Sequence, residues 1–378
     1  MKIVYCIAGT YNSGGMERVL ANKANYWVAH GHEVTIITTD QRGQRPFFPM
    51  DERIVHFDLD VNYEENNGKS FFNKLRKYPF KIWRHKKRLA KLLSDIHADI
   101  VVSMFCNDAF ILPFIHDGSK KVLEVHFSRF KCLQYERKGI WKLVDKYRNS
   151  REIRIASRYN RFVVLTHEDL KYWGNLSNIN VIPNARTFVC DKPAELNNKV
   201  ILAVGRYDFQ KGFELLIDAW AMICRKIEGW KLEIIGDGAQ RNAMLQQIEK
   251  LGLTDNVVLK KVPASQMSDL YANASIYALS SRFEGLPMVL LEAQSAGLPI
   301  VSFACKCGPK DLIEDGVNGF LIEEGDTAGL AKGILRLMED EALRKKMGVA
   351  SYQNSEKYAE DTVMMQWMDL FNGLVSES

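Results

Sequence analysis

The sequence has few of the features that mark disulfide-bonded, zinc-binding or membrane-spanning proteins. Its seven Cys include no CxxC pair, and only Cys305 and Cys307 lie close together. Neither a disulfide framework nor a zinc site is therefore expected. After Met1 and Lys2 only seven uncharged residues precede Thr10, which is too few for a signal peptide or a membrane span. We expect a cytoplasmic protein with scattered, reduced thiols.

Two common nucleotide- and metal-binding patterns are also missing or misplaced. The glycine-containing loop TYNSGG, at residues 10–15, is not GxGxxG, and so only weakly favours a dinucleotide. Asp40 could bind an NAD ribose or could simply cap a strand. The only Asp-x-Asp, Asp58-Leu59-Asp60, lies in a strand-like run far from any glycine loop. We interpret it as structural and expect no divalent metal.

What the chain does have is two stretches of alternating strand and helix. Its 378 residues are 47% hydrophobic and 26% charged, which is typical of a soluble protein with two domains. KIVYCIAG, a glycine loop, a helical segment and HEVTIITTD form a βαβ pattern. KVILAVGRYDFQKGFELLIDAW starts the pattern again at Lys199. Both halves therefore predict an α/β fold with parallel sheets.

The stretch from Ser280 to Pro299, SSRFEGLPMVLLEAQSAGLP, predicts a short buried helix between a proline and a glycine. Glu284 precedes this helix and Glu292 lies within it. A buried carboxylate needs a hydrogen-bonding partner, and the free N–H groups at the helix start form an anion site. One ligand, a nucleoside diphosphate attached to a sugar, could use both features. Alternatively, Glu292 is a structural residue that pairs with a Lys or caps a loop.

The two Glu residues, with seven residues between them, GLP after the first and AxxxGxPIV after the second, resemble the signature of the retaining family 4 glycosyltransferases. GGMER, GRxxxxKG, the Gly236-Asp237-Gly238 turn and VIPNA extend the resemblance over nearly the whole chain. It implies the GT-B fold, with two Rossmann-like domains whose parallel sheets face a central cleft. Residues 1–183 would form the acceptor-binding domain and 184–360 the nucleotide-sugar-binding domain. The helix 361–378 would pack back on the first.

The resemblance also implies roles for particular residues. Arg206 and Lys211 would stabilise the diphosphate, Glu284 and His126 would contact the sugar, and Glu292 would bind the ribose. His126 follows a strand, where a lone His could equally be structural. The remaining donor-binding residues would be Gly14, which would allow the turn, Gly15, which would approach the phosphates, and Gly205, Gly236, Gly285, Leu286, Pro287, Met288 and Val289. No cofactor is implied. Ala185, Lys260-Lys261 and Cys307 depart from the pattern, and the lysine pair lies near the expected base.

Basic residues are concentrated in the first half of the chain. Residues 1–185 carry a net charge of +11, whereas the remainder carries −6. From Lys69 to Lys91 there are ten Lys or Arg and no acidic residue, interleaved with Phe71, Phe72, Tyr78, Phe80 and Trp83. A helix of this kind can lie on an anionic bilayer, although a solvated helix face would look the same. A nucleic acid partner is not expected, because no nucleic-acid-binding motif accompanies the stretch.

Together these features predict a retaining hexosyltransferase that needs no metal. The donor would be a nucleotide sugar, most simply a UDP-sugar. The acceptor would be a growing, lipid-linked glycan of surface polysaccharide synthesis at the cytoplasmic face of the membrane. Two alternatives stay open at this point: a nucleotide-sugar epimerase on the same fold, and a non-catalytic scaffold that binds sugar or membrane.

Overall fold

A computed structural model describes residues 1–66, 71–129, 139–188, 190 and 193–377. The chain divides into two compact units. Unit 1 consists of Met1–Leu165, Leu170–Ile182 and Met364–Ser378, and unit 2 of Thr166–Asp169 and Pro183–Val363. The division at 182/183 falls inside the VIPNA segment.

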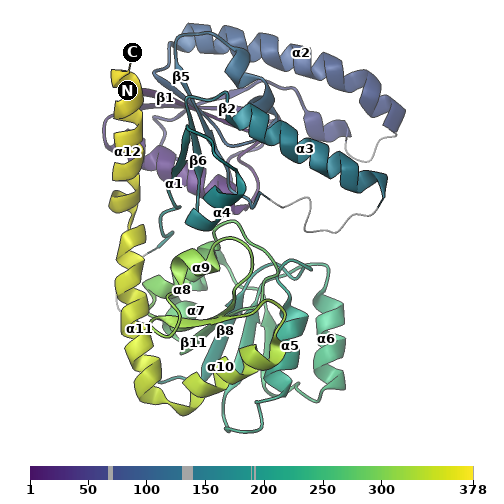
Figure 1. Ribbon diagram of the computed structural model, residues 1–378, viewed down its shortest axis with the longest axis vertical. Helices are drawn as coiled ribbons and strands as arrows, with labels where there is room; N and C mark the ends of the chain where they lie inside the picture. The colour runs from purple at the N-terminus through teal and green to yellow at the C-terminus, as the bar shows by residue number, and fades with distance from the viewer. Residues whose placement is uncertain (67–70, 130–138, 189, 191–192, 378) are drawn as a thin grey trace. The chain divides into compact units, whose positions relative to one another are not determined.

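Unit 1 is built on a parallel sheet, of which seven strands lie in the described residues, in the order β3-β2-β1-β4-β5-β6-β7. The central strands are apolar and buried on both faces, as parallel strands covered by helices require. Helices flank the sheet (Figure 1). The strands are β1 Lys2–Ile7, β2 Glu33–Thr38, β3 Val55–Asp58, β4 Ile100–Ser103, β5 Lys120–Glu124, β6 Arg161–Val164 and β7 Ile179–Val181. The helices are α1 Gly15–Ala29, α2 Phe71–Ile96, α3 Ile140–Ala156 and α4 His167–Tyr172, whose first three residues belong to unit 2.

Unit 2 repeats this plan with a parallel sheet, of which six strands are described, in the order β10-β9-β8-β11-β12-β13. Its strands are β8 Val200–Val204, β9 Lys231–Ile235, β10 Val257–Lys260, β11 Ile276–Leu279, β12 Ile300–Phe303 and β13 Gly319–Ile322. Its helices are α5 Phe213–Ala221, α6 Arg241–Lys250, α7 Met267–Ala272, α8 Met288–Ser295, α9 Pro309–Leu312, α10 Thr327–Glu339 and α11 Glu341–Ser355. The predicted α/β architecture of two parallel-sheet domains is confirmed.

The last helix, α12 Glu360–Ser376, belongs to both units, because residues up to Val363 fall in unit 2 and those from Met364 onward in unit 1. Trp367 and Phe371 are fully buried. The Phe371 ring centroid lies 5.7 Å from that of Trp27 in α1. The C-terminal segment is thus part of the unit 1 core.

Helix α2 carries most of the basic stretch, but not all of its cations face solvent. Lys81 is 9% exposed and donates to the Asn62 carbonyl. The Arg84 guanidinium lies 3.0 Å from the Asp60 carboxylate. Lys77, Lys86, Lys87 and Lys91 are exposed, as are Tyr78, Phe80 and Trp83. Lys69 and the side chains of Phe71 and Phe72 lie outside the described residues. Asp58 and Asp60 bond to neighbouring protein groups, as a structural role requires.

Candidate active site

The loop between β8 and α5 brings a lysine and a glutamate together from distant parts of the chain. Lys211 Nζ lies 2.6 Å from Glu284 Oε1, and the two side chains are only 13% and 7% exposed. Glu284 lies on the loop that leads into α8. Arg206, at the start of the first loop, is 74% exposed at its side chain and lies 3.3 Å from Asp208. One buried ion pair and one exposed guanidinium therefore mark this end of the sheet.

Two glycines allow the loops after β8 and β9 to pass very close to each other. A Cβ on Gly236 would lie 1.9 Å from the Gly205 carbonyl oxygen, and Gly236 has φ +156°. A Cβ on Gly205 would lie 3.1 Å from the Lys211 side-chain carbons. Gly236 therefore has no room for a Cβ, whereas a Cβ on Gly205 would require the flexible Lys211 side chain to shift slightly.

Helix α8 buries Glu292 as the sequence predicts, and two hydroxyl groups hydrogen-bond its carboxylate. Tyr271 Oη donates to Oε2 at 2.8 Å and Thr187 Oγ1 donates to Oε1 at 2.7 Å. Burial, with the charge of Glu292, raises the pKa of the Tyr271 hydroxyl well above its ordinary value, so it stays a donor. A carboxylate has about four acceptor positions. Tyr271 and Thr187 occupy two of these positions.

The loop that follows β12 packs against the start of α8. A Cβ on Gly308 would lie 2.3 Å from Pro287 Cδ, which explains why a glycine with φ +97° occurs there. Leu286 and Pro287 are buried, whereas Gly285, Met288 and Val289 are half-buried. The first N–H groups of a helix have no partner within it. Those of Met288 and Val289 can therefore still bind an anion.

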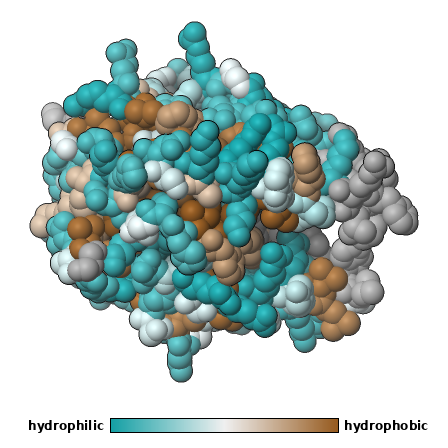
Figure 2. All heavy atoms as spheres, turned by 90° about the horizontal axis from the view of Figure 1, so that it is seen from above, coloured by the Kyte–Doolittle hydropathy of each residue, from teal (hydrophilic) through white to brown (hydrophobic). Residues whose placement is uncertain are grey.

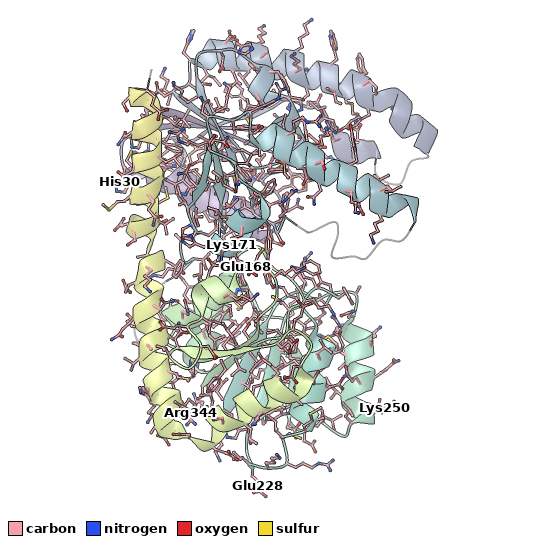
Figure 3. All side chains as sticks on the ribbon, in the orientation of Figure 1. His30, Glu168, Lys171, Glu228, Lys250 and Arg344 are labelled. Carbon is pink, nitrogen blue, oxygen red and sulfur yellow. The ribbon has the colours of Figure 1, made fainter. Side chains whose placement is uncertain are left out.

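Glu168, labelled in Figure 3, joins this loop to the segment 166–169 within unit 2. Its carboxylate accepts a hydrogen bond from Lys310 Nζ and another from the Cys307 N–H, each at 2.9 Å. Cys307, which replaces the glycine of the family pattern, has φ +64°. It thus keeps the backbone conformation that a glycine adopts most easily.

In unit 1, Gly14 and Gly15 stand at the start of α1. Gly14 has φ −77° and ψ 159°, which any residue can adopt, so the expectation that the turn itself needs glycine is wrong. A Cβ on Gly14 would instead meet the carboxylate of Glu17 at 2.2 Å. A Cβ built on Gly15 would meet no described atom within 4 Å outside its own helix, and as the first residue of α1 Gly15 has an N–H without a partner inside the helix.

His126 lies two residues after β5, at the carboxyl edge of the unit 1 sheet. Its Nε2 is 3.1 Å from Oε1 of Glu124, the last residue of β5, and its side chain is 7% exposed. Lys23 of α1 lies 2.5 Å from the same carboxylate oxygen. Burial raises the pKa of the Glu124 carboxyl, but Lys23 and His126 outweigh this and lower it to about 2. Glu124 is therefore ionised.

Sequence reasoning missed four polar partners in these sites: Lys23, Glu124, Thr187 and Tyr271. Lys23 sits on a helix face that is otherwise apolar and buried, and a lysine in such a position is a signal for a buried carboxylate. Thr187 and Tyr271 carry no comparable signal, because isolated hydroxyl residues are common in every loop and helix.

Two family models match the chain and together cover most of it. The model described as Glycosyltransferase Family 4 matches residues 13–186, and that described as Glycosyl transferases group 1 matches residues 188–354. An uncharacterized glycosyltransferase of Haemophilus influenzae is 30% identical over 97% of this chain and 98% of its own length.

The chain belongs to the family 4 glycosyltransferases.

Two further relatives of this glycosyltransferase are similar over nearly their full lengths. The amylovoran biosynthesis glycosyltransferase AmsD of Erwinia amylovora is 28% identical over 98% of this chain and 99% of its own. The second, from Campylobacter jejuni, is an α-1,4-N-acetyl-D-galactosaminyltransferase whose acceptor is a diphospho-undecaprenol-linked glycan. It is 26% identical over 98% of each chain.

Solved structures establish the fold of the glycosyltransferase. A point mutant of S. aureus TarM, in complex with Fondaparinux, α-GlcNAc-glycerol and UDP, superposes with a TM-score of 0.79 at 19% identity. The match covers 98% of this chain and 99% of that one. Sucrose-phosphate synthase of Thermosynechococcus elongatus gives a TM-score of 0.82 at 16% identity over the full length of both. The GT-B fold expected from the sequence is thereby confirmed. The epimerase and scaffold alternatives are not favoured.

Proposed function

We propose that this glycosyltransferase moves a hexosyl group from a UDP-sugar to a hydroxyl of a growing, lipid-linked glycan, with retention of anomeric configuration. The observation that carries the proposal is the buried pair of Lys211 and Glu284, at 2.6 Å, next to the start of α8. A cation and free N–H groups suit a diphosphate, and the carboxylate beside them suits sugar hydroxyls. The amylovoran and undecaprenol-linked relatives support a surface glycan as product.

The chemistry needs charge stabilisation more than acid and base groups. As the bond between sugar and phosphate breaks, the diphosphate gains negative charge and the sugar becomes oxocarbenium-like. Lys211, Arg206 and the first N–H groups of α8 stabilise the diphosphate from positions already set by the fold. Glu284, held against Lys211, stabilises the sugar. The leaving phosphate oxygen takes the proton of the acceptor hydroxyl, which attacks from the same face.

A screen of nucleotide sugars tests this proposal. The purified protein is incubated with UDP-, GDP- and ADP-hexoses, without acceptor and then with membrane lipid extract, and free nucleotide and labelled lipid are measured. We expect slow release of UDP from one UDP-hexose and faster release with extract. Epimerised free donor would instead favour an epimerase, and no turnover of any donor would favour a scaffold.

Activity should not depend on a divalent metal, because cationic side chains and helix N–H groups supply the charge that a metal would supply. Among the described residues, no group of three or more His, Cys, Asp or Glu side chains could hold a metal. We expect the donor hydrolysis rate to be the same with excess EDTA as with added magnesium or manganese. Loss of activity in EDTA that either metal restores would contradict this expectation.

The Glu292→Gln variant should weaken donor binding more than it slows chemistry. The ribose is held alike in the ground and transition states, so KM for the donor should rise about tenfold with kcat little changed. Tyr271→Phe is the matched variant, since it removes one hydroxyl contact to Glu292 but leaves the carboxylate. An unchanged KM in Glu292→Gln, together with lower thermal stability, would identify Glu292 as structural.

Peripheral binding to an anionic membrane is the second part of the proposal. None of the helices in the described part of the chain has the length and apolar character that crossing a bilayer requires. On α2, however, Phe80 and Trp83 are 61% and 57% exposed, and their rings stack with centroids 5.9 Å apart. Lys87 Nζ lies 5.2 Å from the Trp83 ring centroid. Figure 2, which views the molecule from above, shows mainly hydrophilic side chains with separate hydrophobic patches among them. Aromatic rings between lysines suit the headgroup region of a bilayer.

Liposomes with anionic lipid should therefore retain the protein at low salt and release it by roughly 0.5 M, where the Debye length is only a few Å. Replacing the exposed residues Lys77, Lys86, Lys87 and Lys91 with Gln should weaken binding and spare donor hydrolysis. The matched control replaces Lys250 (Figure 3), Lys332, Lys346 and Lys357, which are exposed in unit 2, and should bind normally. Equal loss in both variants, or no binding by the unmodified protein, would rule out α2 as the membrane contact.

A further inference from the structure

Beside His126 in unit 1 lies a buried ion pair that the proposed reaction does not use. Lys23 and Glu124 are 4% and 0% exposed, and Lys23 Nζ lies 2.5 Å from Glu124 Oε1. Taking two charges out of water is costly in proteins, and their attraction recovers this cost only with good geometry. A well-packed apolar pair would be as stable or more stable. The charges therefore call for a role besides stability.

His126 is the group that this pair can act on. His126 Nε2 and Lys23 Nζ approach the same oxygen, Glu124 Oε1, at 3.1 Å and 2.5 Å. The His126 ring is not aligned for a hydrogen bond to Glu124, and neither of its nitrogens has a hydrogen-bond partner among the described residues. A buried polar atom without a partner carries a desolvation cost. A hydroxyl group arriving at Nδ1 would remove that cost.

The charges around His126 decide which protonation state its ring adopts. A buried carboxylate alone would draw a proton onto the neighbouring imidazole. With Lys23 beside it, Glu124 is already neutralised, so the ring can stay uncharged with its Nε2 hydrogen toward Glu124. Two other ionisable groups lie near. Glu17 interacts electrostatically with His126, and Tyr5 with Glu124. Burial raises the pKa of both groups.

The C-terminal helix α12 also contacts Lys23. Lys23 Nζ lies 3.6 Å from the centroid of the Trp367 ring of α12, and Trp367 is fully buried. An ammonium group over an indole face is attracted to the ring more strongly when water is excluded. The Lys23 ammonium group is thus held between the Trp367 ring and the Glu124 carboxylate.

We infer that Lys23 and Glu124 are positioning residues that hold His126 uncharged, with Nε2–H directed at Glu124 and the Nδ1 lone pair offered to a hydroxyl of the substrate. That the hydroxyl belongs to a sugar rests on the proposed function. The state of the ring does not rest on it. In metal sites, removing a carboxylate that orients a ligand histidine typically changes affinity or activity about 10- to 100-fold, and we expect a loss of this order here.

The ring can be observed directly in full-length protein labelled with 15N-histidine. The His126 resonances are assigned by their loss in His126→Gln, and their nitrogen shifts report tautomer and titration. In the unmodified protein we expect the uncharged Nε2–H form at neutral pH. In Lys23→Met, where Glu124 lacks its cation, the titration of the ring should move to higher pH by about one unit or more. In Glu124→Gln it should move to lower pH with mixed tautomers.

Lys121→Met is the matched control, because Lys121 also forms a buried ion pair, with Asp117, at the other end of β5. It should lower stability and leave the His126 resonances unchanged. If Lys23→Met does not fold, Glu124→Gln alone decides. A His126 titration and tautomer unchanged in a folded Lys23→Met or Glu124→Gln would overturn the inference.

Kinetics then separate this inference from the proposed function. With a turned-over donor, kcat of Lys23→Met should fall about 10-fold or more at neutral pH and recover as the pH rises, with KM little changed. Lys23→Arg should restore part of the rate. Shifted His126 resonances without turnover of any nucleotide sugar, even by the unmodified protein, would refute the proposed function and leave the inference standing. Turnover of a nucleotide sugar, with His126 resonances unshifted in the variants, would support the proposed function and refute the inference.

Discussion

Replacing Lys211 with Ala is expected to lower kcat for the donor by about 100-fold or more. Lys211 Nζ is held 2.6 Å from Glu284, and its stem crosses Gly205 in close contact. The fold therefore holds the Lys211 ammonium group in one place beside Glu284. The charge that it stabilises grows only as the bond breaks, so its loss should appear in kcat more than in KM. Steady-state donor hydrolysis measures both.

Removing Lys211 also leaves a buried carboxylate without its cation, and the two effects must be separated. The double variant Lys211→Met with Glu284→Gln removes both charges, and should recover stability without recovering rate. Lys345→Ala is the control, since the Lys345 side chain is 47% exposed and pairs with Glu341 in the same unit. It should keep the normal rate. The kcat of the Arg206→Ala variant should fall as far as that of Lys211→Ala. A well-folded Lys211→Ala variant that turned over donor normally would remove Lys211 from the mechanism.

Replacing Gly236 with Ala should lower the midpoint of thermal unfolding by on the order of 10 °C. The added methyl group would lie 1.9 Å from the Gly205 carbonyl oxygen, at φ +156°. Backbone must move to relieve such a contact, and changes of this kind cost about 4 kcal/mol. In a domain of this size each kcal/mol shifts the midpoint by roughly 2–4 °C. Calorimetry of both proteins gives the comparison.

Gly373→Ala serves as the control for Gly236→Ala. Gly373 lies within α12, and no described atom comes within 4 Å of a Cβ built on it. Alanine should be neutral there or stabilise the helix by up to about 1 kcal/mol. If Gly236→Ala unfolded at the same temperature as Gly373→Ala, the loops after β8 and β9 would have to pass each other less closely than described.

Much of the fold could be predicted because its signals are local. Apolar runs that end at glycine loops, such as residues 2–7 and 200–204, identify the buried parallel strands. The Pro287 start and Gly297 stop bound α8 to within two residues. Each of these patterns depends on side chains within one turn or strand.

The partners of the site residues could not be predicted, because they come from distant parts of the chain. Lys211 and Glu284 are 73 residues apart, and Lys23 and Glu124 are 101 apart. Which side chains meet depends on the order of strands in each sheet and on loop paths, and the residues themselves record neither. The expectation that Gly14 allows the turn failed for a related reason, while its place among the donor-binding residues stays a prediction. A glycine beside a helix start suggests an unusual backbone, but the structure gives it an ordinary φ of −77°.

The two-part membership of α12 reverses the usual order in which a growing chain finishes its domains. Domains generally fold as units, the N-terminal one first during synthesis. Here unit 2 has all its residues once Val363 has been added, while unit 1 still lacks the segment 364–378. That segment brings Trp367 and Phe371 into the core beside Trp27. On the ribosome, the half of the protein that is translated first is therefore the last that can close its core.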